Sequence, residues 1–234
     1  MKILKNILIG LAATISLTSV AYAGSFGLGV TGSYTKIDAS GSETSKAAGT
    51  ETESNQSISV DNDAFLGKLY VEYSFDDASW GSVGNGITFG ASYTPGKADV
   101  SDKVKSRTDV TADANETSSD SRTSTAQAEI ENYMNYYIEL PLYKSIYVKA
   151  GMAQVDVNTL ETSTLATAGK YGNKTLDGTN LGIGFKGVTG SNIVWKLAYE
   201  ETNFDTLNLT STTGDKIKAD LDTSEVNLSI GYRF

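Results

Sequence analysis

The sequence contains no cysteine and no histidine, and only two prolines in 234 residues. Without cysteine the chain can form neither disulfides nor thiolate metal sites, and it has no thiol nucleophile. Without histidine it lacks the side chain that most readily transfers protons near neutral pH. No spacing of the remaining Ser, Lys, Asp or Glu side chains suggests another catalytic arrangement. We therefore expect no enzymatic activity, no cofactor and no metal site.

Basic side chains are scarce as well, because 19 Lys and Arg stand against 28 Asp and Glu. A phosphate backbone attracts basic surfaces, so this balance argues against nucleic acid as a partner. Gly, Ser and Thr are abundant where proline is nearly absent. That composition favours β-strands joined by polar loops over helices.

Long apolar runs are missing except at the N-terminus. There, two lysines precede an apolar stretch over residues 7–20, which ends at Ala21-Tyr22-Ala23. A basic start, a short apolar core and a small-x-small end are typical of a secretory signal peptide. The stretch is short for a spanning helix, which needs ~20 residues. We predict cleavage between Ala23 and Gly24, which divides the chain into a signal peptide, 1–23, and a mature domain, 24–234.

After Gly24 the dominant hydrophobic period is two, which indicates strands with distinct faces. In the last such segment Val226, Leu228, Ile230 and Tyr232 share the apolar face with Phe234, the final residue. Asn132 breaks the alternation of the fourth segment. The eight segments span residues 26–35, 65–75, 87–94, 128–140, 146–153, 181–186, 193–200 and 225–234.

The connections between these segments alternate in length. Those after the second, fourth and sixth segments are short. The four others are long and span roughly residues 37–62, 95–125, 156–178 and 202–223. Short periplasmic turns and long outer loops are typical of membrane barrels, and tilted strands of about ten residues cross a bilayer. We predict an all-β fold, an eight-stranded antiparallel up-and-down transmembrane β-barrel with short periplasmic turns and four long extracellular loops.

The composition of the two faces predicts which of them points outward. A soluble barrel would turn its apolar face inward. Here the apolar face is crowded with Phe, Tyr, Trp and Leu, whereas eight strands enclose a space only just wide enough for side chains. Its aromatic residues also gather near both ends of the segments, as in the two interfacial belts of membrane proteins. We therefore expect the apolar face to contact lipid and the Gly-, Ser- and Thr-rich face to line the lumen.

With its Ala-x-Ala signal, eight alternating segments and closing Val-x-Leu-x-Ile-x-Tyr-x-Phe, the chain resembles the small outer-membrane β-barrels of the OmpA, OmpX and opacity-protein type. The resemblance covers the whole mature chain and implies a location in the outer membrane of a Gram-negative cell, with the lipid bilayer as partner. It also implies that Tyr232 and Phe234 form the signal read by the barrel-assembly machinery. These families include adhesins, structural anchors and narrow pores.

Residues 27–32 match the G-x-G-x-x-G string of dinucleotide-binding loops. That loop requires a strand before it and a helix after it. Here the string lies within an alternating strand segment, directly after the signal peptide. We interpret the glycines as small residues that leave room for side chains from across the lumen.

Eleven charged side chains alternate onto the lumen face. Buried charges must be paired or hydrated. We expect a plug of salt bridges, filled in by lumen tyrosines, because eight-stranded barrels rarely enclose a continuous channel. The alternative is a narrow pathway with a basic inner half and an acidic outer half. The predicted network comprises Lys68, Glu72, Glu129, Glu131, Glu139, Lys149, Lys186, Lys196, Glu200, Glu225 and Arg233. The tyrosines are Tyr70, Tyr133, Tyr137 and Tyr147.

The long connections are polar and poor in apolar residues, which favours mobility over residues 38–59 and 101–125. Any surface binding would be carried by such loops. Carboxylates such as Glu51, Glu53, Asp61 and Asp63 could bind calcium, but no loop matches an EF-hand and no site is assigned. The leading hypothesis is a structural or surface-interaction barrel that displays its four loops to an extracellular ligand. The alternative is a narrow, porin-like channel for small solutes.

Replacing Phe234 with Ser tests the role of the terminal strand. Export across the inner membrane should be unaffected, whereas assembly of the barrel should be impaired because the terminal aromatic is lost. Quantifying heat-modifiable protein in outer-membrane fractions measures the effect. A normal amount in the variant would show that Phe234 is not needed for assembly.

Overall fold

The computed structural model describes residues 24–44, 55–75, 86–101, 105–111, 120–163 and 170–234. This part of the chain is almost entirely β-strand, and it contains no helix that is both long and apolar enough to cross a membrane. The strands are β1 (Gly24–Thr44), β2 (Asn55–Phe75), β3 (Thr88–Asp99), β4 (Lys105–Thr111), β5 (Asp120–Tyr143), β6 (Ile146–Ser163), β7 (Lys174–Val188), β8 (Ile193–Phe204), β9 (Leu207–Thr210) and β10 (Lys216–Arg233).

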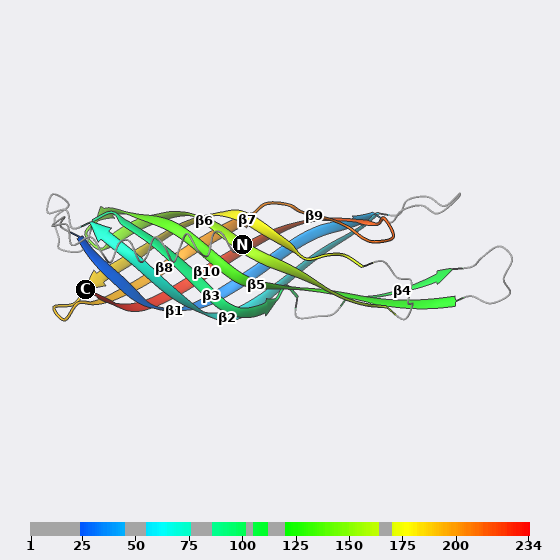
Figure 1. Cartoon of the computed structure of the whole chain (residues 1–234), viewed down its shortest axis with the longest axis horizontal. Helices are drawn as coiled ribbons and strands as arrows, with labels where there is room; N and C mark the ends of the chain where they lie inside the picture. Colours follow the sequence, from blue (N-terminus) through cyan, green and yellow to red (C-terminus); the bar gives the residue numbers. More distant parts are fainter. Residues whose placement is uncertain (1–23, 45–54, 76–85, 102–104, 112–119, 164–169) are drawn as a thin grey trace.

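Eight of these strands form a closed antiparallel ring in the order β1-β2-β3-β5-β6-β7-β8-β10, and β10 pairs back with β1. The closing ladder runs from Gly27 opposite Arg233 to Thr44 opposite Lys216. The two remaining strands lie outside the ring, since β4 pairs with β5 and β9 pairs with β10. Figure 1 shows the tilted strands of an elongated barrel, with the C-terminus at one end and the β4–β5 hairpin projecting from the other. The predicted eight-stranded up-and-down barrel is confirmed.

The strands extend well beyond the predicted segments. β1 and β2 stay paired from Gly24 opposite Phe75 to Thr44 opposite Asn55, so much of the expected loop over residues 37–62 is a β-hairpin. The other three long connections also contain strand, including β4, β9 and the outer parts of β5, β6 and β10. The sequence prediction ended the segments too early because the outward positions become polar there, although the two-residue period continues.

The wall of the barrel is apolar on the outside over the predicted crossing segments, as expected. Phe65 is 86% exposed, and many other large apolar side chains on the outer face are about half exposed. An outer wall that exposes this much apolar surface needs lipid around it, whereas a water-soluble barrel would hide it. The exposed apolar side chains of this wall include Leu28, Val30, Leu69, Phe89, Met152, Leu181, Ile183, Phe185, Trp195, Leu197, Val226, Leu228 and Ile230.

Asn132, the residue that breaks the alternation, is a bulge residue with a φ of 54°. Asparagine adopts this left-handed conformation more readily than most residues. The register of β5 shifts here against both neighbours, and β3 has its own irregularity between Thr94 and Lys97. Beyond the bulge the faces of β5 exchange, so Ile130 is buried inside the barrel. Glu129 and Glu131 therefore lie on the outer wall, and the prediction that they face the lumen is wrong.

The interior has two layers along the barrel axis. The end with the short turns encloses most of the buried charged and hydroxyl side chains, together with the buried Tyr70, Tyr137 and Tyr147. The other end encloses an apolar layer, which we call the septum. Its buried members are Ile37, Val100, Ile130, Tyr133, Ala153, Val155, Val157, Leu176, Phe204, Leu207 and Leu221.

Glycines on the lumen face provide space for tyrosines from other strands. Gly29 and Gly231 lie opposite each other on β1 and β10. The hydroxyl of Tyr70 occupies the space above both, because a Cβ on Gly29 would lie 2.5 Å from it. Tyr147 covers Gly184 in the same way, at 2.8 Å from a Cβ built there. Within the glycine string of β1, Gly27 and Gly29 thus make room for Glu72 and Tyr70, whereas Gly32 lies on the outward face and meets no side chain.

Valine at Gly29 should therefore destabilise the barrel, and valine at Gly32 serves as the matched control. A Cβ at Gly29 would also lie 2.6 Å from the Cα of Gly231, whereas a Cβ at Gly32 meets nothing within 4 Å. Overpacking of this kind costs about 1–3 kcal/mol. Urea unfolding of the refolded barrels in lipid vesicles measures the difference. Equal stability of the two variants would contradict the packing of Tyr70 against Gly29.

Candidate functional site

Nine of the eleven predicted lumen charges lie inside the barrel, and none of the nine is more than 8% exposed. They come from six strands of the ring, because alternate residues of each strand point inward. They form two layers, which we call the outer and inner ion-pair layers. The outer layer contains Lys68, Glu225, Lys149 and Glu200, and the inner layer contains Glu72, Glu139, Lys186, Lys196 and Arg233.

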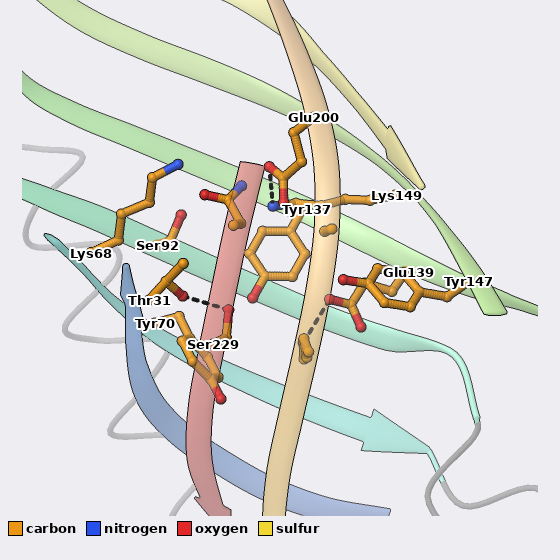
Figure 2. A pocket seen from close by; sticks show the side chains of 13 residues that line it. Thr31, Lys68, Tyr70, Ser92, Tyr137, Glu139, Tyr147, Lys149, Glu200 and Ser229 are labelled. Atoms are coloured by element: carbon orange, nitrogen blue, oxygen red, sulfur yellow. Dashed lines mark hydrogen bonds and ion pairs between the residues drawn. The ribbon is translucent and has the colours of Figure 1, made fainter. Parts of the chain in front are cut away.

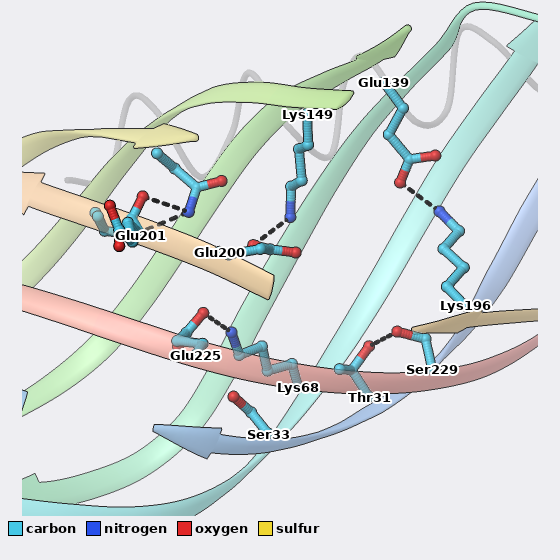
Figure 3. Close-up of polar contacts among 12 residues, drawn as sticks. Thr31, Ser33, Lys68, Glu139, Lys149, Lys196, Glu200, Glu201, Glu225 and Ser229 are labelled. Atoms are coloured by element: carbon cyan, nitrogen blue, oxygen red, sulfur yellow. Dashed lines mark hydrogen bonds and ion pairs between the residues drawn. The ribbon is translucent and has the colours of Figure 1, made fainter. Parts of the chain in front are cut away.

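The outer ion-pair layer consists of two separate pairs (Figure 3). Lys68 on β2 donates to the Glu225 carboxylate on β10, with an Nζ–Oε2 distance of 2.5 Å. Lys149 on β6 donates to Glu200 on β8, with an Nζ–Oε2 distance of 2.7 Å. Thr35 Oγ1 donates a further hydrogen bond of 3.2 Å to Glu225. Each carboxylate in this layer therefore has a cation in direct contact.

The inner ion-pair layer is a connected network centred on Lys196. Its ammonium group contacts both the Glu72 carboxylate and, at 2.6 Å, Oε1 of Glu139. Lys186 reaches the other oxygen of Glu139 at 3.2 Å. Arg233 donates to Ser74 Oγ at 3.2 Å. Both glutamates are thus compensated by lysines from other strands, which is the condition for burying charge at a tolerable cost.

Tyrosine rings fill the space between the ion pairs. The ammonium group of Lys149 lies 4.0 Å from the centroid of the Tyr137 ring, and that of Lys196 lies 5.3 Å from the Tyr70 ring. A cation over an aromatic face is attracted by the ring quadrupole, more so when water is excluded. The ammonium group of Lys186 lies 5.5 Å from the centroid of the Tyr147 ring, and that of Lys68 lies 5.4 Å from the Tyr133 ring. The lumen tyrosines therefore both pack the interior and contact its cations.

One cavity lies among these side chains, with a volume of about 30 Å³. It is lined by lysines and glutamates of both layers and by Tyr70, Tyr137 and Asn227 (Figure 2). A water molecule needs about 10–15 Å³ of such space, so the cavity has room for about two. Tyr70 Oη and Asn227 Oδ1 are buried without a protein partner, and water in the cavity would satisfy them. A cavity of this size can hold water among the ion pairs.

Glu129 and Glu131 form a separate group with Lys97 on the outer wall. Lys97 contacts the carboxylate of Glu129 and lies 3.6 Å from that of Glu131. The hydrogen bond from Lys97 lowers the pKa of the Glu129 carboxyl. Sequence reasoning placed these two residues in the lumen because it carried the alternation through Asn132 unchanged. Lys97, the third member of this group, is exposed and lies opposite Glu131 in the β3–β5 pairing.

Carboxylates dominate the outer wall just beyond the bilayer-facing aromatic residues. Asp38 on β1 lies directly opposite Asp61 on β2 and Asp222 on β10. Partial burial, then the charges of Asp220 and Asp38, raises the pKa of Asp222. In the described ranges no group of three or more acidic side chains is placed to hold a metal ion. Glu51 and Glu53, also considered as calcium ligands, lie outside those ranges.

The terminal strand places its two predicted signal residues on the outer wall. The rings of Tyr232 and Phe234 are 5.0 Å apart, and both are exposed. Phe234 is held by a hydrogen bond of 2.8 Å from its amide to the carbonyl of Phe26. Gly24 begins β1, whereas Ala23 and the rest of the predicted signal peptide lie outside the described residues.

Removing the cation of one outer pair should destabilise the barrel, and removing its partner as well should restore much of the loss. Lys149→Met leaves Glu200 as an uncompensated buried charge, for which a cost of about 3–5 kcal/mol is typical. Lys149→Met with Glu200→Gln removes both charges at similar volume. Urea unfolding in lipid vesicles gives the free energies. A double variant no more stable than Lys149→Met would contradict the pairing.

No protein-family model and no curated protein sequence matches the chain. Several solved structures are similar to it in fold. The attachment invasion locus protein Ail of Yersinia pestis is 13% identical, with a TM-score of 0.41 over 90% of this chain and 97% of that one. The outer membrane protein OprG of Pseudomonas aeruginosa is 10% identical, with a TM-score of 0.41 over 91% and 97% of the two chains. The outer membrane protease OmpT of Escherichia coli is 7% identical, with a TM-score of 0.45 over 92% and 99%.

These likenesses concern the fold and say nothing about activity. The chain's own features define its environment: a closed ring of strands, an apolar outer wall and a polar, filled lumen. Exposed aromatic residues ring the wall near the two edges of the apolar band, as at the interfaces of a bilayer. The chain is a small β-barrel of the bacterial outer membrane.

Proposed function

We propose that this protein is a non-conducting, non-catalytic barrel that anchors in the outer membrane and displays its extracellular hairpins for a structural or surface-interaction role. The observation that carries the proposal is the complete pairing of the lumen glutamates. Glu72, Glu139, Glu200 and Glu225 each contact at least one lysine ammonium group. A lumen used for transport would keep its charges hydrated and available to solutes.

The charge distribution in the lumen also favours a plug over a pathway. The alternative hypothesis, a porin-like channel, expects a basic inner half and an acidic outer half. Instead, Lys68 and Lys149 accompany the two outer glutamates, and three cations accompany the two inner ones. Each layer is therefore close to neutral. The small cavity is the one feature that favours the channel, and its volume of about 30 Å³ is that of about two waters.

The same pairing supports the absence of catalysis. The chain has neither histidine nor cysteine, so a lysine or a carboxylate would have to act as the general base, even for a serine or threonine nucleophile. The four lumen lysines, Lys68, Lys149, Lys186 and Lys196, donate hydrogen bonds to glutamates, so these amines are poorly placed to accept a proton.

Surface interaction would be carried by the hairpins at the end opposite the short turns. The β1–β2 hairpin continues about ten residues beyond the aromatic belt, and the β4–β5 hairpin projects further still (Figure 1). Rigid strands that carry polar outward positions present a defined surface to a ligand. We also propose that Tyr232 and Phe234 present the assembly signal and that residues 1–23 are removed during export.

Two measurements on the intact protein test this function. The purified barrel in planar bilayers should give no steady conductance, and steady channels that change in Lys149→Ala or Lys196→Ala would overturn the plug. Removing residues 106–125, which contain all but the first residue of β4 and the part of β5 paired with it, should abolish the binding of expressing cells to surfaces or other cells. A matched variant replaces the short turn at residues 189–191 with glycines. Unchanged cell binding after the hairpin deletion, with normal heat-modifiable protein, would remove this hairpin from the proposed role.

A further inference from the structure

The polarity of the barrel reverses along its axis, on the inside and the outside at the same level. On β1 the outward residues change from Val30 and Tyr34 to Lys36 and Asp38. Over the same stretch the inward residues change from Thr35 to Ile37, which is fully buried. The wall thus passes from apolar to charged where the interior passes from charged to apolar.

The same reversal occurs on the neighbouring strand β10 and across the ring on β6. On β10, Glu225 points inward and Val226 outward near the lumen charges. Four residues earlier, Leu221 points inward and Asp222 outward. On β6, Val155 and Val157 are buried inside, beyond the level of Lys149. On β5 the bulge at Asn132 produces the exchange, so that Ile130 joins the interior.

The septum occupies a full cross-section of the barrel. All eight ring strands and β9 contribute to it, either through a buried member or through a partly buried residue packed against it, and Val100 directly follows β3. Ile37, Val155 and Leu176 have essentially no exposed surface. Apart from the Tyr133 hydroxyl, the side chains of this layer offer neither a hydrogen-bond partner nor a charge to a passing ion or water.

Tyr133 joins the septum to the outer ion-pair layer. Its ring packs 5.9 Å from that of Phe204 within the septum and lies 5.4 Å from the ammonium group of Lys68. Its hydroxyl is 2.8 Å from Thr202 Oγ1. The apolar layer therefore lies directly beyond the outer ion pairs, with Tyr133 in contact with both.

We propose that the septum is a second, dry seal that closes the outer end of the barrel independently of the ion-pair plug. The reversal at its level places it beyond the outer bilayer boundary, so this part of the barrel stands in water around a core of its own. Apolar constrictions block ions by excluding water, whereas ion pairs block them by filling space with fixed charge. Loss of one seal leaves the other intact. This inference extends the proposed non-conducting role to variants in which the plug is broken.

The absence of native cysteine allows the dryness of the septum to be measured directly. Leu221→Cys places a thiol within the septum, and Asp222→Cys places one on the adjacent outward position. A small charged methanethiosulfonate should label Asp222→Cys in the folded barrel. Over the same reaction time Leu221→Cys should remain unlabelled in the folded barrel, and it should become labelled only after the protein is denatured. Labelling of Leu221→Cys as fast as Asp222→Cys, in protein with normal heat-modifiable mobility, would overturn the dry septum.

A reporter thiol in the polar lumen tests the independence of the two seals. Ala198→Cys lines the cavity between the ion-pair layers. One of the two outer ion pairs is removed by Lys149→Met with Glu200→Gln, and the septum is opened by Val155→Ser with Leu221→Ser. Asp156→Ser with Asp222→Ser is the matched control, because these are the adjacent outward positions. Heat-modifiable mobility shows that each variant is folded, and Val155→Ala with Leu221→Ala replaces the serine pair if that pair does not fold.

The reporter should stay unlabelled from the outside in the ion-pair variant and in the control, and it should become labelled when ion-pair and septum substitutions are combined. Labelling in the ion-pair variant alone would show that the septum does not seal. A combined variant that stays unlabelled would also overturn the proposal. Steady conductance of the unmodified barrel would instead contradict the proposed function, so the two failures are distinguishable.

Discussion

The narrowness of an eight-stranded ring is the constraint on which the rest of this structure depends. Such a ring encloses little more than the side chains of its own strands, so every inward position must fit, pair or make room. Gly29 and Gly231 accommodate the hydroxyl of Tyr70, and Lys196 compensates two glutamates at once. The pairing of the lumen is therefore as much a packing requirement as an electrostatic one, because an unpaired charge would have neither water nor a partner.

The interior is filled in two different ways along the barrel axis, by ion pairs in one part and by apolar side chains in the other. Where lipid surrounds the wall, apolar side chains face outward and the inward positions carry ion pairs. Beyond the bilayer, water surrounds the wall, so carboxylates face outward and the septum provides an ordinary apolar core. The bulge at Asn132 allows one strand to take part in both regimes. The proposed double seal agrees with the surface role that we propose for this protein.

Much of the site followed from the sequence, and its errors have identifiable causes. Alternation assigned nine of the eleven charges to the lumen correctly, because a regular strand exposes every second residue to the same side. Glu129 and Glu131 were misplaced because Asn132 shifts the phase of β5, and its break in the pattern was the available signal. The septum was missed although Ile37 and Leu221 keep the two-residue period. From the sequence, these residues were assigned to loops because their outward neighbours are polar. A strand whose outward positions change from apolar to polar has the same pattern as the end of a membrane-spanning strand.

The sequence by itself determined that the barrel ring has eight antiparallel strands, which face of the wall meets lipid and which side chains supply most of the lumen charges. These features depend on local periodicity and on the lengths of the connections. Only the tertiary structure decided which charges meet. Lys196 and Glu72 are 124 positions apart and come together because tilt and register bring β8 and β2 to the same height across the lumen. The reversal of polarity was likewise decided only in three dimensions. Whether an inward residue meets an ion pair or an apolar core depends on what the closed ring places opposite it.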